Sequence, residues 1–262
     1  MTVVKKHWQK LLLLSALSLL IVLTATAVVT AQERDTPHRD TATGGTTDAV
    51  KVNEDADAVT PTTILVIGDS VTEGTDYGGR GAANWTALVQ SDLSEESSNS
   101  CPILLRVSGR GGSGYATTGT RKTTFGSETE RLLTPDVSAV VYVGSGNDLS
   151  QLSSDYVNSV VQTVDLVHDH NPDASVLIVG PSWIHNGPVP AEYLRANELL
   201  ANAARRADAL FVDPIASGWF DDAPKTGIVG ADGRHPTDAG HAIIASRMRP
   251  ILKDLGRSGR CP

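Results

Sequence analysis

Thr63-Ile-Leu-Val-Ile67-Gly68-Asp69-Ser70 is the segment from which the architecture of this chain can be worked out. Its first five residues are β-branched or leucine, a composition typical of a buried strand in a parallel sheet. The glycine and the two small polar residues that follow favour a sharp turn. Ligands of parallel α/β sheets bind beyond the carboxyl ends of the strands, so Ser70 is a candidate nucleophile. The same three residues also fit an ordinary turn.

Four more segments have the character of short buried strands, and stretches with a helical spacing of apolar residues separate them. The five predicted strands cover residues 63–67, 103–107, 139–143, 175–179 and 209–212. Predicted helices cover residues 85–93, 157–167 and 191–207, and a last one runs from Pro236 toward Leu255. Pro250 lacks a backbone donor and is expected to kink or interrupt this last helix. The alternation predicts a three-layer α/β fold, in which helices cover both faces of a doubly wound, five-stranded parallel sheet.

The N-terminus has the pattern of an export signal. A positively charged start with Lys5 and Lys6 precedes an apolar run over residues 11–29. Small residues at positions 29–31 predict cleavage before Gln32, but the run is also long enough to remain as a membrane anchor. Residues 1–31 are therefore assigned to a signal peptide or signal anchor. Both alternatives place the rest of the chain outside the cytoplasmic membrane, either secreted or tethered.

Residues 32–60 are rich in Thr, Asp, Gly and Ala and contain scarcely any large apolar side chain. Such a segment cannot offset the entropy of ordering by burial, so we predict a flexible linker, with a polar arm packed on the domain as the alternative. Residues 61–262 are sufficient for one hydrophobic core and are assigned to a single catalytic domain. We expect this domain to be a monomer.

The charge balance disfavours one broad class of partner. The chain has a formal net charge of -8 and a pI near 5.3. Nucleic-acid sites need clustered Lys and Arg residues, and the body of the sequence has no such cluster. It also lacks His, Cys and carboxylate residues at the spacing of metal ligands. We expect no nucleic-acid partner, no metal ion and no organic cofactor.

Cys101 and Cys261 are the two cysteines of the chain. Export into an oxidising compartment allows a disulfide to persist. In a doubly wound sheet the last helix runs back from the functional edge, which brings Cys261 toward the second strand, whose start follows Cys101. A disulfide between Cys101 and Cys261 is therefore predicted, with two unpaired thiols as the alternative.

Asp232-Gly-Arg-His235 lies in the loop before the last predicted helix. A carboxylate three residues before an imidazole can accept its Nδ1–H and so turn Nε2 toward a serine. In the alternative interpretation Asp232 is a turn former and His235 a surface residue. Structural roles are expected for three other histidines within or at the ends of predicted helices, His168, His170 and His241.

Acyl transfer also needs hydrogen-bond donors for the oxyanion, and two loops at the ends of predicted strands offer them. The first is Ser108-Gly-Arg-Gly-Gly-Ser-Gly114-Tyr115, whose glycines permit close approach of the backbone to a ligand. The second is Gly144-Ser-Gly-Asn147-Asp148, whose Asn side chain can direct an N–H at the same point. The first loop lacks the Gly-Lys-Ser/Thr ending of a P-loop and the spacing of a dinucleotide-binding fingerprint, so a phosphate cradle is disfavoured.

In their order, these four loops resemble the blocks of the SGNH (GDSL-like) hydrolase family: Ser in G-D-S, then Gly, then Asn in G-x-N-D, then D-x-x-H. The resemblance spans about residues 63–255 and implies a flavodoxin-like SGNH hydrolase fold. It also implies that Ser70 is the nucleophile, His235 the base and Asp232 its orienting partner. The oxyanion hole would be formed by Ser70, Gly114 and Asn147.

Two departures from the family pattern affect these assignments. The first block reads G-D-S-V rather than G-D-S-L, an exchange between apolar residues that should matter little. The second block has Gly109 where many members carry Asn, which leaves Gly111 and Gly112 open as alternatives to Gly114. The α/β-hydrolase fold is disfavoured, because no G-x-S-x-G elbow occurs in the chain.

The resemblance implies a serine esterase without a cofactor that acts on carboxylic esters of small molecules or polysaccharides. The lack of a lid-like apolar segment favours short acyl groups, such as acetyl esters of carbohydrate or lipid. Trp183, in the loop after the fourth predicted strand, is either a wall or sugar platform of the site or a core residue. An acyltransferase with the same triad and a non-catalytic extracellular binding module remain as alternatives, and the complete set of site residues argues against the latter.

Overall fold

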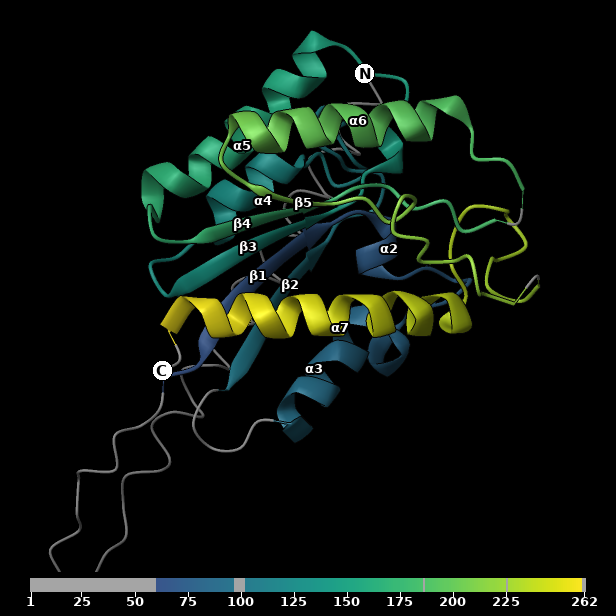
Figure 1. The fold of residues 1–262 in the computed structure, drawn as a ribbon, viewed down its shortest axis with the longest axis horizontal. Helices are drawn as coiled ribbons and strands as arrows, with labels where there is room; N and C mark the ends of the chain where they lie inside the picture. Colours follow the sequence, from purple (N-terminus) through teal and green to yellow (C-terminus); the bar gives the residue numbers. More distant parts are fainter. Residues whose placement is uncertain (1–59, 97–101, 186, 225, 261–262) are drawn as a thin grey trace, which may run out of the picture. The chain divides into compact units, whose positions relative to one another are not determined.

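The five predicted strands form one parallel sheet in the computed structural model, which describes residues 60–96, 102–185, 187–224 and 226–260. The strand order is β2-β1-β3-β4-β5, so the chain enters near the middle of the sheet and is wound outward in both directions (Figure 1). The strands are β1 (Thr62–Gly68), β2 (Ile103–Gly109), β3 (Val137–Val143), β4 (Ser175–Val179) and β5 (Leu210–Val212). The predicted fold class is confirmed.

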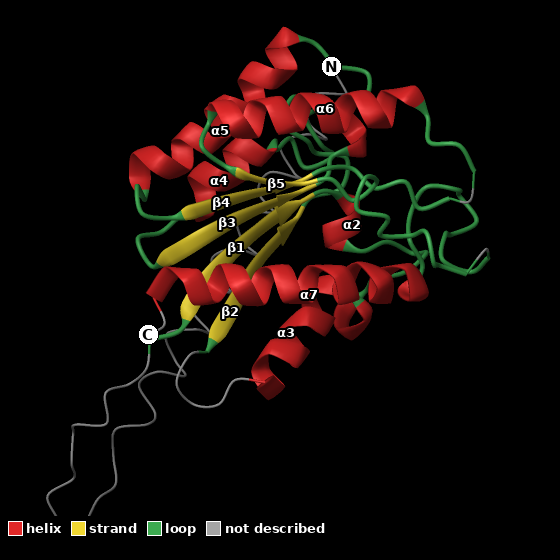
Figure 2. Cartoon of the chain, in the orientation of Figure 1, coloured by secondary structure: helices red, strands yellow, loops and turns green. Residues whose placement is uncertain are grey.

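Helices cover both faces of this sheet (Figure 2). The long helices are α3 (Trp85–Glu96), α4 (Phe125–Leu132), α5 (Ser154–His170), α6 (Ala191–Arg206) and α7 (Asp238–Arg260). Helices α3 and α7 pack on one face, and α4, α5 and α6 on the other. Shorter helices lie in the connections, namely α2 (Ser70–Glu73) and the 3-10 helices η1 (Gly81–Ala83) and η2 (Gly146–Asp148).

The central strand β1 contributes side chains to both hydrophobic cores. Leu65 and Ile67 pack beneath α4, α5 and α6, whereas Ile64 and Val66 pack beneath α3 and α7. All four side chains are fully buried. Because burial of an aliphatic side chain stabilises a fold by about 1.5–3 kcal/mol, β1 joins the two helical layers firmly. The residues that follow β1 therefore start from a fixed position.

The strand and helix boundaries differ from the predictions in only a few places. Strand β4 coincides with its predicted range, and β2 and β3 are each two residues longer than predicted. Helix α4 is absent from the sequence-based predictions, because its only large apolar residues, Phe125 and Leu132, are too few to define a helical pattern. A capping box starts this helix, in which Thr124 and Ser127 exchange side-chain to backbone hydrogen bonds.

Pro250 was expected to kink or interrupt the last helix, and the expected interruption does not occur. Helix α7 continues through Pro250 as one helix (Figure 1). Pro250 and Ser246 are exposed, so water can bond the carbonyl oxygen of Ser246, which lacks its helical donor. On the opposite face Met248 and Leu252 are fully buried, and their packing holds the helix in register on the sheet.

Several predictions fall outside the described residues and stay predictions. They concern the signal segment 1–31, the linker up to residue 59, and the pairing of Cys101 with Cys261. Within the described ranges, no helix has the length and apolar character needed to cross a membrane.

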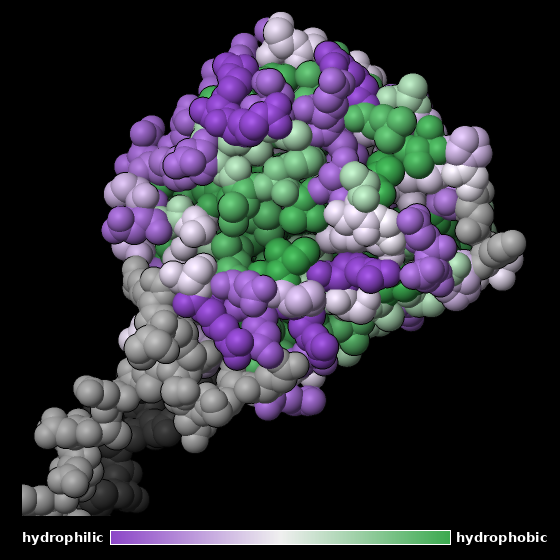
Figure 3. Space-filling view, in the orientation of Figure 1, coloured by the Kyte–Doolittle hydropathy of each residue, from purple (hydrophilic) through white to green (hydrophobic). Residues whose placement is uncertain are grey.

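Strand β5 forms one edge of the sheet, and apolar side chains are exposed beside it. Figure 3 shows a hydrophobic area between α6 and α7, at the place where Figure 1 shows β5. Leu210 in this strand is 57% exposed. Since β5 has only three residues, it offers little free backbone for pairing with a strand of another chain.

Candidate active site

Ser70 is the first residue of α2, two positions beyond the end of β1. Asp69 caps this short helix, because its Oδ1 accepts the N–H of Val71 at 2.9 Å. Gly68 allows the close turn, since a Cβ at this position would collide with the side chain of Thr72. The turn presents the Ser70 hydroxyl at the carboxyl edge of the sheet, where the sequence places it.

The side chains of Ser70, His235 and Asp232 form a continuous line of hydrogen bonds. The Nε2 atom of His235 lies 2.9 Å from Oγ of Ser70, and its Nδ1 atom lies 2.5 Å from Oδ2 of Asp232. Oδ1 of Asp232 accepts the backbone N–H groups of Arg234 at 3.0 Å and of His235 at 3.2 Å. The fold therefore brings together two segments that lie 165 residues apart in the sequence.

The carboxylate of Asp232 remains ionised over the neutral and mildly acidic pH range. Burial by itself raises its pKa, but hydrogen bonds from the imidazole of His235 and from two backbone N–H groups lower the pKa to about 2. A charged acceptor at Nδ1 favours the tautomer in which Nε2 is free to accept a proton. A hydroxyl with such a base at hydrogen-bonding distance has the geometry of an activated nucleophile.

The family model of the GDSL-like Lipase/Acylhydrolase family matches residues 66–243, which include all three of these side chains. The chain belongs to this family. It is a carboxylic ester hydrolase. The GDSL lipase Rv0518 of Mycobacterium tuberculosis (strain ATCC 25618 / H37Rv) is 39% identical over 192 residues, which cover 72% of this chain and 80% of that protein.

Two solved structures share the fold of this GDSL-like hydrolase. A putative arylesterase from Agrobacterium tumefaciens str. C58 has a TM-score of 0.56 at 18% identity, over 74% of this chain and 99% of that chain. A catalytic mutant of Axe2, an acetylxylan esterase from Geobacillus stearothermophilus, has a TM-score of 0.56 at 19% identity, over 74% of this chain and 94% of that chain. At this level of identity the likeness concerns the fold.

Asp148 connects the two predicted oxyanion loops of the GDSL-like hydrolase, which follow β2 and β3, by hydrogen bonds. This residue is fully buried, and burial raises its pKa. Its carboxylate accepts three consecutive backbone N–H groups of the glycine-rich loop, those of Tyr115 at 2.8 Å, Ala116 at 3.2 Å and Thr117 at 2.8 Å. The loop after β2 is thus held in one conformation by the loop after β3.

Gly114, predicted as an oxyanion donor, forms its backbone hydrogen bond inside the glycine-rich loop. Its N–H donates to the carbonyl oxygen of Thr117 at 2.9 Å, within the loop, and Gly114 does not line the active-site pocket. A Cβ on Gly114 would collide with the carboxylate of Asp148, so the residue serves close packing here. The alternative Gly111 is also engaged, because its N–H donates to Oε2 of Glu73 at 2.6 Å.

Asn147, by contrast, lines the pocket beside Ser70. Its Nδ2 atom donates one hydrogen to the carbonyl oxygen of Ser113 at 2.9 Å and lies 3.4 Å from Oδ2 of Asp69. The N–H of Ser70 is the first of α2 and has no acceptor within that helix. Ser70 and Asn147, the residues of two predicted oxyanion donors, thus both line the same pocket.

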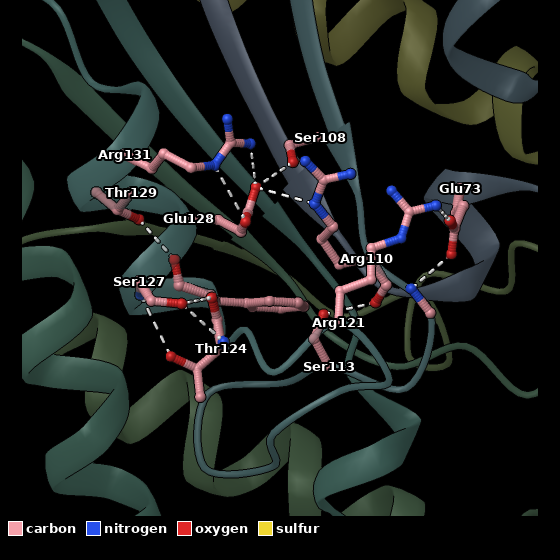
Figure 4. A network of polar contacts seen from close by, with 12 residues as sticks. Glu73, Ser108, Arg110, Ser113, Arg121, Thr124, Ser127, Glu128, Thr129 and Arg131 are labelled. Atoms are coloured by element: carbon pink, nitrogen blue, oxygen red, sulfur yellow. Dashed lines mark hydrogen bonds and ion pairs between the residues drawn. The ribbon is translucent and has the colours of Figure 1, made fainter. Parts of the chain in front are cut away.

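A second polar cluster holds the start of the glycine-rich loop (Figure 4). Glu128 of α4 is buried, accepts the hydroxyl of Ser108 at 2.6 Å, and pairs with Arg110 at 3.2 Å and with Arg131 at 2.6 Å. Burial by itself raises the pKa of Glu128, but the bonds from Arg131 and Ser108 and the charge of Arg110 lower it. Since unpairing such a buried charge costs about 3–5 kcal/mol, α4 fixes this part of the loop.

The hydroxyl of Ser70 opens onto a pocket of about 110 Å³. Its apolar lining consists of Val71, Val143, Pro181, Ile184, Pro236 and Ile244. Two polar side chains that sequence reasoning did not single out, Tyr193 of α6 and Arg234, also line it. Trp183, predicted to be either a wall of the site or a core residue, is not among the residues that line this pocket. Its ring lies edge-on to that of Tyr193, with the two centroids 5.1 Å apart. The D-x-x-H motif gave no signal for Arg234, because it leaves that position unspecified.

His241 has the structural role expected for it. The residue is 1% exposed, and its Nδ1 accepts the N–H of Trp85 at 3.3 Å. Burial lowers the pKa of His241 to about 4, so the ring is neutral near pH 7. In the part of the chain that the structure describes, no group of three or more His, Cys, Asp or Glu side chains is arranged to hold a metal ion.

Proposed function

We propose that this hydrolase is an exported serine esterase that cleaves short acyl esters through a covalent acyl-enzyme on Ser70. The observation that carries the proposal is the hydrogen-bonded line from Asp232 through His235 to the Ser70 hydroxyl, which ends at the pocket. A serine hydroxyl is a weak nucleophile by itself, and a base at this distance removes its proton as it attacks.

In the proposed mechanism, Nε2 of His235 takes the proton of Ser70 while Oγ attacks the ester carbonyl carbon. The charge of Asp232 stabilises the imidazolium ion that forms. The oxyanion of the tetrahedral intermediate accepts hydrogen bonds from the Ser70 N–H and the Asn147 amide. His235 then protonates the leaving alcohol. In the second half of the reaction His235 takes a proton from water, the water attacks the acyl-enzyme, and the acid and free Ser70 are released.

The pocket supports short acyl groups as the substrate class. Its volume of about 110 Å³ and its aliphatic lining fit a short acyl group better than a long chain. The acetylxylan esterase with the same fold acts, by its name, on acetyl esters of a polysaccharide, and the arylesterase on aryl esters. We extend this to acetyl or similarly short esters of carbohydrate or lipid for the present chain.

Export and oligomeric state rest on other features. The positively charged and apolar start of the sequence supports secretion or an N-terminal tether. The short β5 edge supports a monomer.

Hydrolysis of the 4-nitrophenyl esters of acetate, butyrate and octanoate by the purified protein tests the proposal. We expect kcat/KM to be highest for the two shorter esters. In Ser70→Ala, kcat should fall by about 10⁴-fold or more, because the nucleophile is lost. The matched control is Ser246→Ala, which changes an exposed serine of α7 and should keep the wild-type rate. A wild-type rate in Ser70→Ala, or no hydrolysis of any ester, would contradict the proposal.

A further inference from the structure

Arg234 lines the active-site pocket, and the proposed hydrolysis gives its side chain no role. The residue is exposed and directly precedes the base His235 in the sequence. Its backbone is fixed, because its N–H donates to Oδ1 of Asp232 at 3.0 Å. The guanidinium group therefore extends from a rigid point at the edge of the reacting centre.

Tyr193 provides a second polar group in the same pocket. Burial raises the pKa of its hydroxyl, and the positive charge of Arg234 acts against this rise, so the two side chains interact electrostatically. The Tyr193 ring is held by its edge-on contact with Trp183. The Oη atom of Tyr193 lies 3.9 Å from the position that a Cβ on Gly146 would occupy, and Gly146 directly precedes Asn147 in the sequence. The phenol therefore faces the reacting centre.

Arg234 has no carboxylate partner of its own within the described residues. Six other arginines pair with Asp or Glu at 3.2 Å or less, namely Arg80, Arg106, Arg110, Arg121, Arg131 and Arg195. Two acid groups that lie near the pocket have other partners: Asp232 pairs with His235, and Asp69, which lines the pocket but is 5% exposed, accepts the N–H of Val71. An unpaired guanidinium group at a pocket is suited to bind a carboxylate with two parallel hydrogen bonds.

We propose that Arg234, assisted by the Tyr193 hydroxyl, selects ester substrates that carry a carboxylate close to the scissile bond. This inference rests on the proposed esterase function and names a substrate class for the same site. The carboxylate can belong to the acyl part, as in a half-ester of a dicarboxylic acid, or to the alcohol part, as in an acetylated hydroxy acid. Both sources present the same planar anion to Arg234.

Two matched pairs of esters distinguish these sources. Monoethyl succinate against ethyl pentanoate places the charge in the acyl part, and 4-acetoxybenzoate against its methyl ester places it in the alcohol part. Hydrolysis is followed by titration of the released acid for the first pair and by absorbance of the released phenol for the second. For each pair the measured quantity is the ratio of kcat/KM for the charged ester to kcat/KM for the neutral ester.

We expect the wild-type enzyme to prefer the charged ester in at least one pair, and Arg234→Gln to lower that ratio about tenfold or more, mainly through KM. Arg234→Lys should keep part of the preference, because it retains the charge but loses the planar fork. Tyr193→Phe should lower the ratio by a smaller factor. Arg205→Gln, a matched loss of one exposed positive charge at the end of α6, should leave the ratio unchanged.

The inference is overturned if the wild-type enzyme prefers the neutral ester in both pairs, or if Arg234→Gln leaves both ratios unchanged. The same holds if Arg205→Gln lowers the ratio as much as Arg234→Gln, since the net charge of the protein would then be the cause. If the wild-type enzyme hydrolyses 4-nitrophenyl acetate but none of the four esters, this inference alone is overturned. If it hydrolyses neither 4-nitrophenyl acetate nor any of the four esters, the proposed function fails, and this inference with it.

Discussion

Two aspartates of the site lie in opposite electrostatic environments. Asp232 is hydrogen-bonded by His235 and by two backbone N–H groups, which hold its pKa at about 2. Asp69 is 5% exposed, and burial raises its pKa to about 6, although the N–H of Val71 and the charge of His235 act against this rise. Asp232 can thus orient the base at any pH near neutrality, whereas Asp69 changes its charge within the physiological range.

Replacement of Asp69 by Asn tests this difference through the pH dependence of stability. The folded state binds the proton of Asp69 more tightly than the unfolded state does, so the contribution of Asp69 to stability is full below pH 3.8 and is lost as the pH rises through about 6. Asn has no such proton and still caps α2. The free energy of unfolding of Asp69→Asn relative to wild type should therefore increase by about 2 kcal/mol between pH 4 and pH 7.

Urea unfolding at several pH values measures this difference. Asp165→Asn is the control, because it removes one exposed carboxylate on α5, and the change with pH should be larger for Asp69→Asn than for this variant. If the difference in free energy of unfolding between Asp69→Asn and wild type does not change with pH, burial does not raise the pKa of Asp69.

At the scale of elements, the loop between α2 and α3 is locked onto α7. The N–H of Gly79 donates to Oδ1 of Asp238, the first residue of α7, at 2.8 Å. The buried ring of His241 packs directly against Gly79, whose φ of +73° lies in the left-handed region. Since α7 is preceded by the loop that carries the base, this contact also steadies the active site.

Gly79→Ala should destabilise the protein by about 2–4 kcal/mol. The new Cβ adds left-handed backbone strain of about 1–2 kcal/mol and also collides with the imidazole of His241. Gly227→Ala is the control, because Gly227 has a φ of +85° and open space where its Cβ would stand. Chemical denaturation should give the larger loss for Gly79→Ala. Equal losses in the two variants would show that the packing of His241 on the loop does not contribute.

The elements that sequence could predict are those with a strong hydrophobic pattern. The continuous apolar runs of the strands identify the parallel sheet, because both of its faces are covered. Helix α4 escaped prediction, since its buried face includes the polar side chains of Glu128 and Thr129. The hydrogen bond from the Gly114 N–H to Thr117 could not be predicted from the sequence either, because a turn within the loop decides which way that N–H points. Pro250 does not interrupt α7, because the packing of this helix outweighs the loss of one exposed hydrogen bond.

At the scale of the whole molecule, the site is assembled from the carboxyl edge of the sheet and the loop before α7. The positions of Ser70, Asn147, Asp232 and His235 could be predicted, since motifs at strand ends meet at this edge. The partnership of Tyr193 with Arg234 could not. The two residues come from a helix start and from a loop, and only the three-dimensional packing brings them to one pocket.

Labelling of the intact protein with a fluorophosphonate, followed by peptide mapping in a mass spectrometer, examines whether His235 activates Ser70. The account predicts one adduct per molecule, located on Ser70, and labelling at least about a hundredfold slower in His235→Ala that retains the wild-type circular dichroism spectrum. An adduct on a different serine, or the same labelling rate in wild type and His235→Ala, would contradict it.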